Sequence, residues 1–177
     1  MLPDAMANEV REGYHIERPN RGKAASKATK AVVILLLLVS GFLMFVVLLG
    51  GWSRLAGMQV VLIGYILVYI VMAYYTARWN RGVLPIAAAL AIILGIFAAI
   101  SGPEWFNRDK EGFSSPALDE SFLGLITLLI IPVQLLLIAF SMRGFQQEWN
   151  VEVEVPDGQH YHEGMHFDDE GSRPATA

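Results

Sequence analysis

Four long uncharged windows constrain the fold of this chain more than any other feature. Each window contains 22 or 23 residues: 31–53, 55–77, 82–103 and 121–142. A helix needs about 20 mostly apolar residues to cross the ~30 Å hydrocarbon core of a bilayer. Continuous apolarity also argues against a β-barrel, whose strands alternate apolar and polar side chains. We therefore predict an all-α membrane protein, an up-down four-helix bundle with transmembrane spans at about 31–51, 57–77, 83–101 and 121–142.

The polar segments around these windows divide the chain into three parts. Residues 1–30 form a basic tail, residues 31–142 form the four-span domain with an outer loop at 102–120, and residues 143–177 form an acidic tail. Six Lys/Arg and four Asp/Glu lie in residues 1–30, whereas residues 142–177 contain two Arg and eight acids. Tails of opposite charge can pair with each other or face different partners.

The positions of the basic residues predict the orientation of the protein. Lys and Arg lie mainly before the first window and in the loop at Arg78 and Arg81. Because cytoplasmic loops of multi-pass proteins are enriched in Lys and Arg, both termini are predicted to be cytoplasmic. The expected membrane is a bacterial inner (plasma) membrane. The first window is longer than a signal-peptide core, so we expect it to remain as an anchor.

The two tails have different patterns. The N-terminal tail contains scattered Pro and Gly, which predicts a flexible, mostly irregular segment. A basic helix is expected to start near Ala24. In the second, residues 151–155 alternate Val and Glu, which is typical of a strand, and Pro156-Asp157-Gly158 is a turn. Residues 159–162 could return as a second strand and complete a short β-hairpin. Because a lone hairpin is marginally stable, we expect the N-terminal tail or another subunit to cover it.

The third span contains a row of small residues. Ala87, Ala91, Gly95 and Ala99 recur every four positions, which places them near one another on one side of a helix. Such rows let helix backbones approach closely in lipid, where the hydrophobic effect does not drive helices together. We expect this row to pack against the second or fourth span. The alternative is a docking face for another protein.

The fourth span carries a helix-breaking residue and a polar one. Pro132 removes a backbone hydrogen bond, and Gln134 is an amide at mid-depth that we expect to bond across helices. A polar residue beside a broken helix also occurs at transporter sites. A second hypothesis is therefore a small transporter or channel, an oligomer whose pore is lined by Gln134, Ser40 and Tyr69.

The histidines of the acidic tail are the candidate metal ligands. His160, His162 and His166 precede Asp168, Asp169 and Glu170, and imidazole with carboxylate suits zinc, copper or nickel. A third hypothesis is a metal-responsive membrane protein that uses this tail. Incidental metal binding is the alternative interpretation.

Several common signals of catalysis and redox chemistry do not occur in the sequence. The windows contain no Asp, Glu, Lys, Arg or His, and the chain has no cysteine, no phosphate-binding loop and no G-x-S-x-G. We predict no enzymatic activity, no cofactor, no nucleic-acid partner and no disulfide-linked partner. Expected partners are the lipid bilayer and other membrane-protein subunits. Our first hypothesis is an accessory or assembly subunit of a larger membrane complex, such as a respiratory one.

Overall fold

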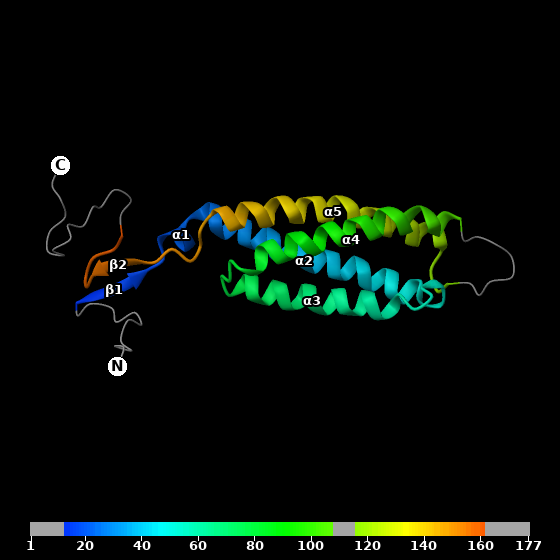
Figure 1. Ribbon diagram of the computed structural model, residues 1–177, viewed down its shortest axis with the longest axis horizontal. Coiled ribbons are helices and arrows are strands. Elements are labelled where there is room, and N and C mark those ends of the chain that lie inside the picture. Colours follow the sequence, from blue (N-terminus) through cyan, green and yellow to red (C-terminus); the bar gives the residue numbers. More distant parts are fainter. Residues whose placement is uncertain (1–12, 108–115, 162–177) are drawn as a thin grey trace, which may run out of the picture.

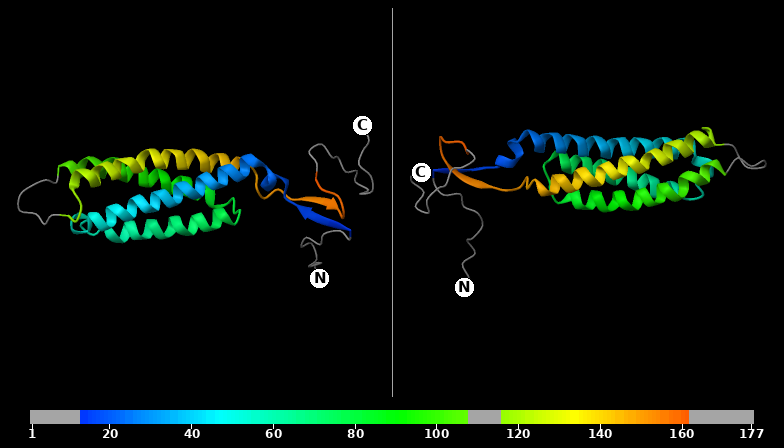
Figure 2. Two further views of the ribbon diagram at one scale, coloured as in Figure 1. Left: turned by 180° about the vertical axis from the view of Figure 1, so that it is seen from behind. Right: turned by 90° about the horizontal axis from the view of Figure 1, so that it is seen from above.

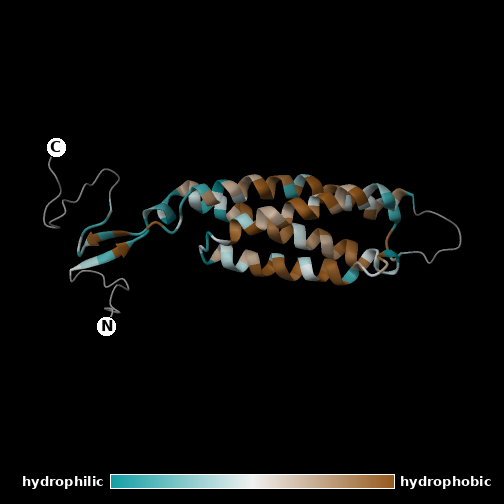
Figure 3. Ribbon diagram, in the orientation of Figure 1, coloured by the Kyte–Doolittle hydropathy of each residue, from teal (hydrophilic) through white to brown (hydrophobic). Residues whose placement is uncertain are grey.

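The computed structural model describes residues 13–107 and 116–161, and four long helices dominate it (Figure 1). These are α2 (Ala24–Gly50), α3 (Gln59–Ala77), α4 (Val83–Phe106) and α5 (Glu120–Gln146). All four are long and apolar enough to cross a membrane. They run alternately up and down in an elongated bundle, and apolar residues cover most of their length (Figure 3).

Three of the four helices extend beyond the predicted spans, whereas α3 begins at Gln59, two residues inside its span. α2 begins at Ala24, where a basic helix was expected, and it continues into the first apolar window without a break. α4 does not end near 101 but continues through Pro103 to Phe106. The reason is packing, because this last turn buries Trp105 against Val47 and Leu123. α5 begins where the Asp119 carboxylate accepts a hydrogen bond from a backbone N–H, as an N-cap does.

The four helices pack unequally. α4 lies along α5 over most of its length, and α2 packs against both α3 and α5, whereas α3 and α4 make few contacts. The main core lies between the helices and includes Leu37, Met44, Tyr69, Ala91 and Leu137. Exposed apolar side chains cover the outside, as expected of helices that face lipid. The seam between α3 and α4 is therefore the least closed side of the bundle.

We call the end of the bundle where α2 ends and α5 begins the far end. Short irregular segments close it. A 3-10 turn, η1 (Trp52–Arg54), follows α2. A side chain at Gly51 would collide with the buried indole of α4, because a Cβ there would lie 2.5 Å from Cη2 of Trp105. The Arg54 guanidinium pairs with the carboxylate of Glu120 at 3.1 Å, which connects η1 to the start of α5.

A two-stranded sheet projects from the other end of the bundle (Figures 1 and 2). β1 (Tyr14–Glu17) pairs antiparallel with β2 (Val153–Pro156), with Tyr14 opposite Pro156 and Glu17 opposite Val153. A single turn of helix, α1 (Pro19–Gly22), connects β1 to α2. We call this two-stranded sheet the terminal ribbon.

The terminal ribbon corrects two predictions about the tails. The C-terminal strand pairs with the N-terminal tail, and residues 159–161 form no strand, so the predicted hairpin within the C-terminal tail was wrong. The irregular N-terminal tail was also wrong for residues 13–23, which contain β1 and α1. The physical reason is that α2 and α5 are neighbours, so the chain enters and leaves the bundle at adjacent points and brings two distant segments together.

Candidate functional site

A chain of buried hydrogen bonds connects three helices in the middle of the bundle. The Tyr69 hydroxyl of α3 donates to Oε1 of Gln134 in α5 at 2.9 Å. The Gln134 amide donates in turn to the Ser40 hydroxyl of α2 at 2.9 Å, and Ser40 donates to the Leu36 carbonyl at 2.7 Å. All three polar residues are buried. The three residues that the transporter hypothesis placed along a pore are therefore buried and bond to one another.

Pro132 lies two residues before this amide, inside α5. The helix continues on both sides of it, from Glu120 to Gln146. Proline has no N–H to donate to the preceding turn, so α5 lacks one backbone hydrogen bond at this depth. Gln134 lies close to this weakened turn and is the residue through which α5 bonds to both α2 and α3.

The predicted small-residue row contributes to the contact between α4 and α5. Ala87 and Ala91 are buried, and a Cβ on Gly95 would lie 3.7 Å from Cβ of Gln134. Ala99 is exposed, and its neighbour Ala98 is buried instead. The small-residue face continues at Gly102, where an added Cβ would lie 2.6 Å from a methyl of Leu128. The predicted row therefore did not include Ala98 and Gly102, although both are small residues at helical spacing.

Aromatic and basic side chains tie the tails to the bundle. Trp149, which follows α5, is completely buried and packs edge-to-face on Trp79, with ring centroids 5.3 Å apart. The Lys30 ammonium lies 4.0 Å from the centroid of the Trp79 ring, a cation–π distance. Arg21 donates from Nε to the backbone carbonyl of Trp149 at 2.9 Å. These contacts bring two indole rings and two cations together at the point where both tails leave the bundle.

Polar contacts extend this connection outward to the terminal ribbon. Arg18 forms an exposed ion pair with Glu152, just before β2. Three more hydrogen bonds connect Gln147 to Thr29, Asn20 to the Glu148 carbonyl and Arg81 to Asn150. We call this set of contacts, together with those around Trp79 and Trp149, the terminal clasp. The basic and acidic tails thus contact each other, which was one of the two possibilities that their charges allowed.

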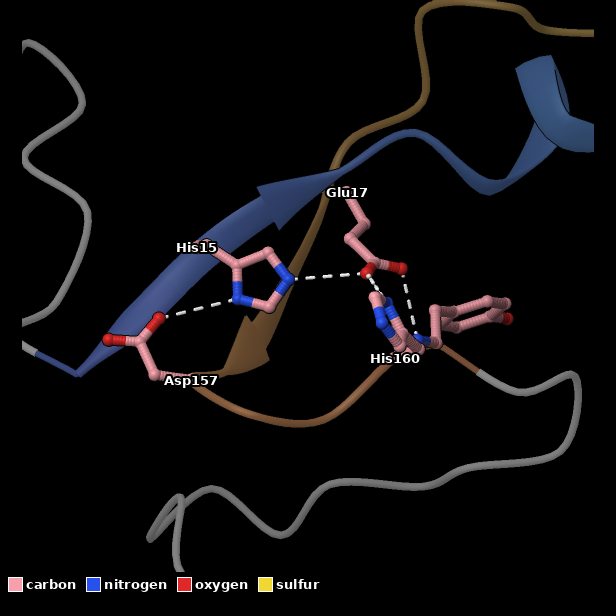
Figure 4. Close-up of polar contacts among 5 residues, drawn as sticks. His15, Glu17, Asp157 and His160 are labelled. Carbon is pink, nitrogen blue, oxygen red and sulfur yellow. Dashed lines mark hydrogen bonds and ion pairs between the residues drawn. The ribbon is translucent and has the colours of Figure 1, made fainter.

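Two histidines converge on one carboxylate at the terminal ribbon (Figure 4). Oε1 of Glu17 lies 3.2 Å from Nε2 of His15 and 2.8 Å from Nδ1 of His160, and Nδ1 of His15 lies 3.4 Å from a carboxylate oxygen of Asp157. The Tyr161 backbone N–H donates to Oε2 at 3.0 Å. This N–H, followed by the His160 and His15 imidazoles, lowers the pKa of Glu17 to about 2.

Only one of the predicted metal ligands lies in the part of the chain that the structure describes. His160 is highly exposed and contacts Glu17, while His162 and His166 lie outside the described residues. Within residues 13–107 and 116–161, no group of three His, Asp or Glu side chains has a geometry that could hold a metal ion. His15 was not foreseen as a neighbour of His160, because 145 positions separate them in the sequence.

Comparisons with protein-family models, curated proteins and solved structures find no match to this chain.

Proposed function

We propose that this chain is an accessory or assembly subunit of a larger membrane complex and has no catalytic site of its own. The observation that supports this most directly is the terminal ribbon. Its two strands come from opposite ends of the chain, and the terminal clasp fixes them to a bundle from which they project (Figure 2). The bundle thus holds a small β element in a defined position, as a docking subunit needs.

The terminal ribbon has the chemistry of a strand acceptor. Within the described residues, each strand pairs with one neighbour only, so each has an open edge. Open edges present unpaired N–H and C=O groups, and an extended segment of a partner can add to them. Two strands alone are also marginal in water, so a third strand from a partner would stabilise them.

The centre of the bundle supports a scaffolding role. Tyr69, Gln134 and Ser40 use their polar groups on one another, and the apolar windows contain no ionisable side chain. Ion and proton paths through membranes usually depend on such ionisable groups. The proposed location is a bacterial inner membrane. We place both tails in the cytoplasm, because the described parts of both tails and the basic loop at Arg78–Arg81 share one end of the bundle.

Affinity purification from native membranes tests this proposal. Tagged full-length chain would be extracted in mild detergent, separated on native gels and analysed by mass spectrometry for stoichiometric partners. Val155→Asp, at a buried position of β2, should lose the partner, whereas Val151→Asp, at an exposed position before β2, should keep it. Recovery of the wild-type chain only as a free monomer would overturn the proposal.

A further inference from the structure

The loosely closed seam between α3 and α4 contains an apolar groove. It encloses a cavity of about 170 Å³ near the far end of the bundle. Leu62 and Tyr65 of α3 form one wall, and Leu94, Ala98 and Trp105 of α4 form the other. Thr127 of α5 lies at its base. The groove is open on the outside of the bundle, between two helices that are long enough to span a membrane.

The two aliphatic hydroxyls of the lining are already used. The Ser101 hydroxyl donates to the Phe97 carbonyl at 2.8 Å, and the Thr127 hydroxyl donates to the Leu123 carbonyl at 2.8 Å. Because these hydroxyls bond to their own helices, they offer little to a polar ligand. The remaining lining is mostly hydrocarbon, and its other polar groups are the Tyr65 hydroxyl and the Trp105 indole N–H. The groove therefore favours an apolar occupant.

The length of the groove matches the depth of one leaflet. From Leu94 to Trp105 a helix rises about 16 Å at ~1.5 Å per residue. One leaflet contributes half of the ~30 Å hydrocarbon core, or about 15 Å. The groove also lies only in the far-end halves of α3 and α4, because the tight loop after Ala77 holds their other ends together.

The volume is too small for a large ring system. Ligand pockets for drug-sized molecules or cofactors measure roughly 300–1,000 Å³, and this cavity is smaller. An apolar cavity of ~150 Å³ in a protein core holds a molecule the size of benzene. We propose that the groove binds one acyl chain of a phospholipid from the leaflet at the far end. This inference assumes the membrane setting of the proposed function and does not depend on a protein partner.

Photo-crosslinking in defined vesicles tests the proposal. The full chain would be placed in phosphatidylcholine–phosphatidylglycerol vesicles containing a phospholipid with a diazirine on one acyl chain, and adducts would be mapped by mass spectrometry. Adducts at Leu62, Phe97 and Ala98 should exceed, several-fold, those at lipid-facing residues away from the groove, such as Ile70 and Leu125. Equal labelling of all exposed faces would overturn the proposal, because it indicates ordinary solvation by lipid.

Two pairs of variants distinguish a specific site from general lipid contact. Ala98→Phe fills the groove, and Ala99→Phe places the same ring on the exposed neighbour. Ile100→Trp on the exposed rim and Ile96→Trp outside the lining form a second pair that leaves the core intact. The first member of each pair should abolish the excess labelling, and the second should not. Unchanged labelling in Ile100→Trp, or a crosslinked dimer through this seam in place of lipid adducts, would contradict the proposal.

Discussion

The Tyr69 hydroxyl and the Gln134 side-chain carbonyl form a buried hydrogen bond of 2.9 Å across the middle of the bundle. This bond has an effect beyond its own strength, because the amide of Gln134 continues the chain to Ser40. One glutamine thus connects α5 to α2 and α3, which lie on different sides of it. Inside a membrane, where no water replaces a lost partner, such a contact favours one register of the helices over others.

Tyr69→Phe should destabilise the bundle by about 0.6–2 kcal/mol, the range for interhelical hydrogen bonds in membranes. The variant removes the donor and leaves Oε1 of Gln134 buried without that partner. The free energy of unfolding would be measured by denaturant titration in mixed micelles. Tyr65→Phe is the matched control, because Tyr65 contacts the ring of Tyr69 and lies outside the hydrogen-bonded chain. Equal losses in the two variants would show that the hydroxyl bond contributes nothing specific.

Ala91→Leu and Gly95→Leu should each destabilise the bundle by about 1–3 kcal/mol, the usual cost of overpacking. Ala91 is completely buried, and Gly95 faces the Gln134 side chain. Ala99→Leu should change stability little, since Ala99 is exposed. The same denaturant titration compares the three variants. A stable Ala91→Leu protein that no longer purifies with its partners would instead assign this row to docking.

The small-residue row shows how far sequence reasoning reached. Residues spaced by four drift around a helix, because four steps exceed one 3.6-residue turn. A row extrapolated from Ala87 by fours therefore leaves the interface by Ala99. The observed face returns to Ala98 and Gly102, which follow the mixed spacing of three and four that keeps a face toward its partner. The helices themselves were predictable from the apolar windows, since each window exceeds the length that a bilayer requires.

The terminal ribbon could not be located from the sequence in the same way. Alternation of Val and Glu identified the β2 region, but strand pairing depends on which segments the bundle brings together. Ile16 pairs with Glu154 although most of the chain separates them in sequence. Nothing in the sequence around either residue identifies the other as its partner. Trp149 is completely buried, although a tryptophan so close to the end of a span more often lies in the aromatic belt at the membrane interface. Its partner, Trp79, lies in the loop between α3 and α4.

Trp149→Ala should release the C-terminal strand from the bundle. The substitution removes a completely buried indole and its edge-to-face contact with Trp79, and burials of this kind are worth about 3–5 kcal/mol. Hydrogen exchange of the β1 and β2 amides should become much faster, while the middle of α4 stays protected. Trp52→Ala at the exposed far end is the control. Unchanged protection of β1 would show that the ribbon holds without the terminal clasp.

Acid should loosen the contact between β1 and the segment that follows β2 below about pH 4.5. The pKa of Glu17 is lowered from an ordinary value of 4.5 to about 2, chiefly by the Tyr161 N–H and then by His160 and His15. A carboxyl with a lowered pKa stabilises the folded state above its unfolded pKa, and this stability is lost as the pH falls toward the folded value.

Spin labels on Ile16→Cys and Gln159→Cys would report the distance between β1 and the segment that follows β2. The labels attach only at these two positions, because the chain has no native cysteine. The distance distribution should broaden between pH 4.5 and 2. Glu17→Gln should already be broad at pH 7 and should change less over that window, whereas Glu154→Gln, at an exposed carboxyl of β2, should behave like the parent protein. An identical acid response in the parent protein and Glu17→Gln would exclude Glu17 as its source.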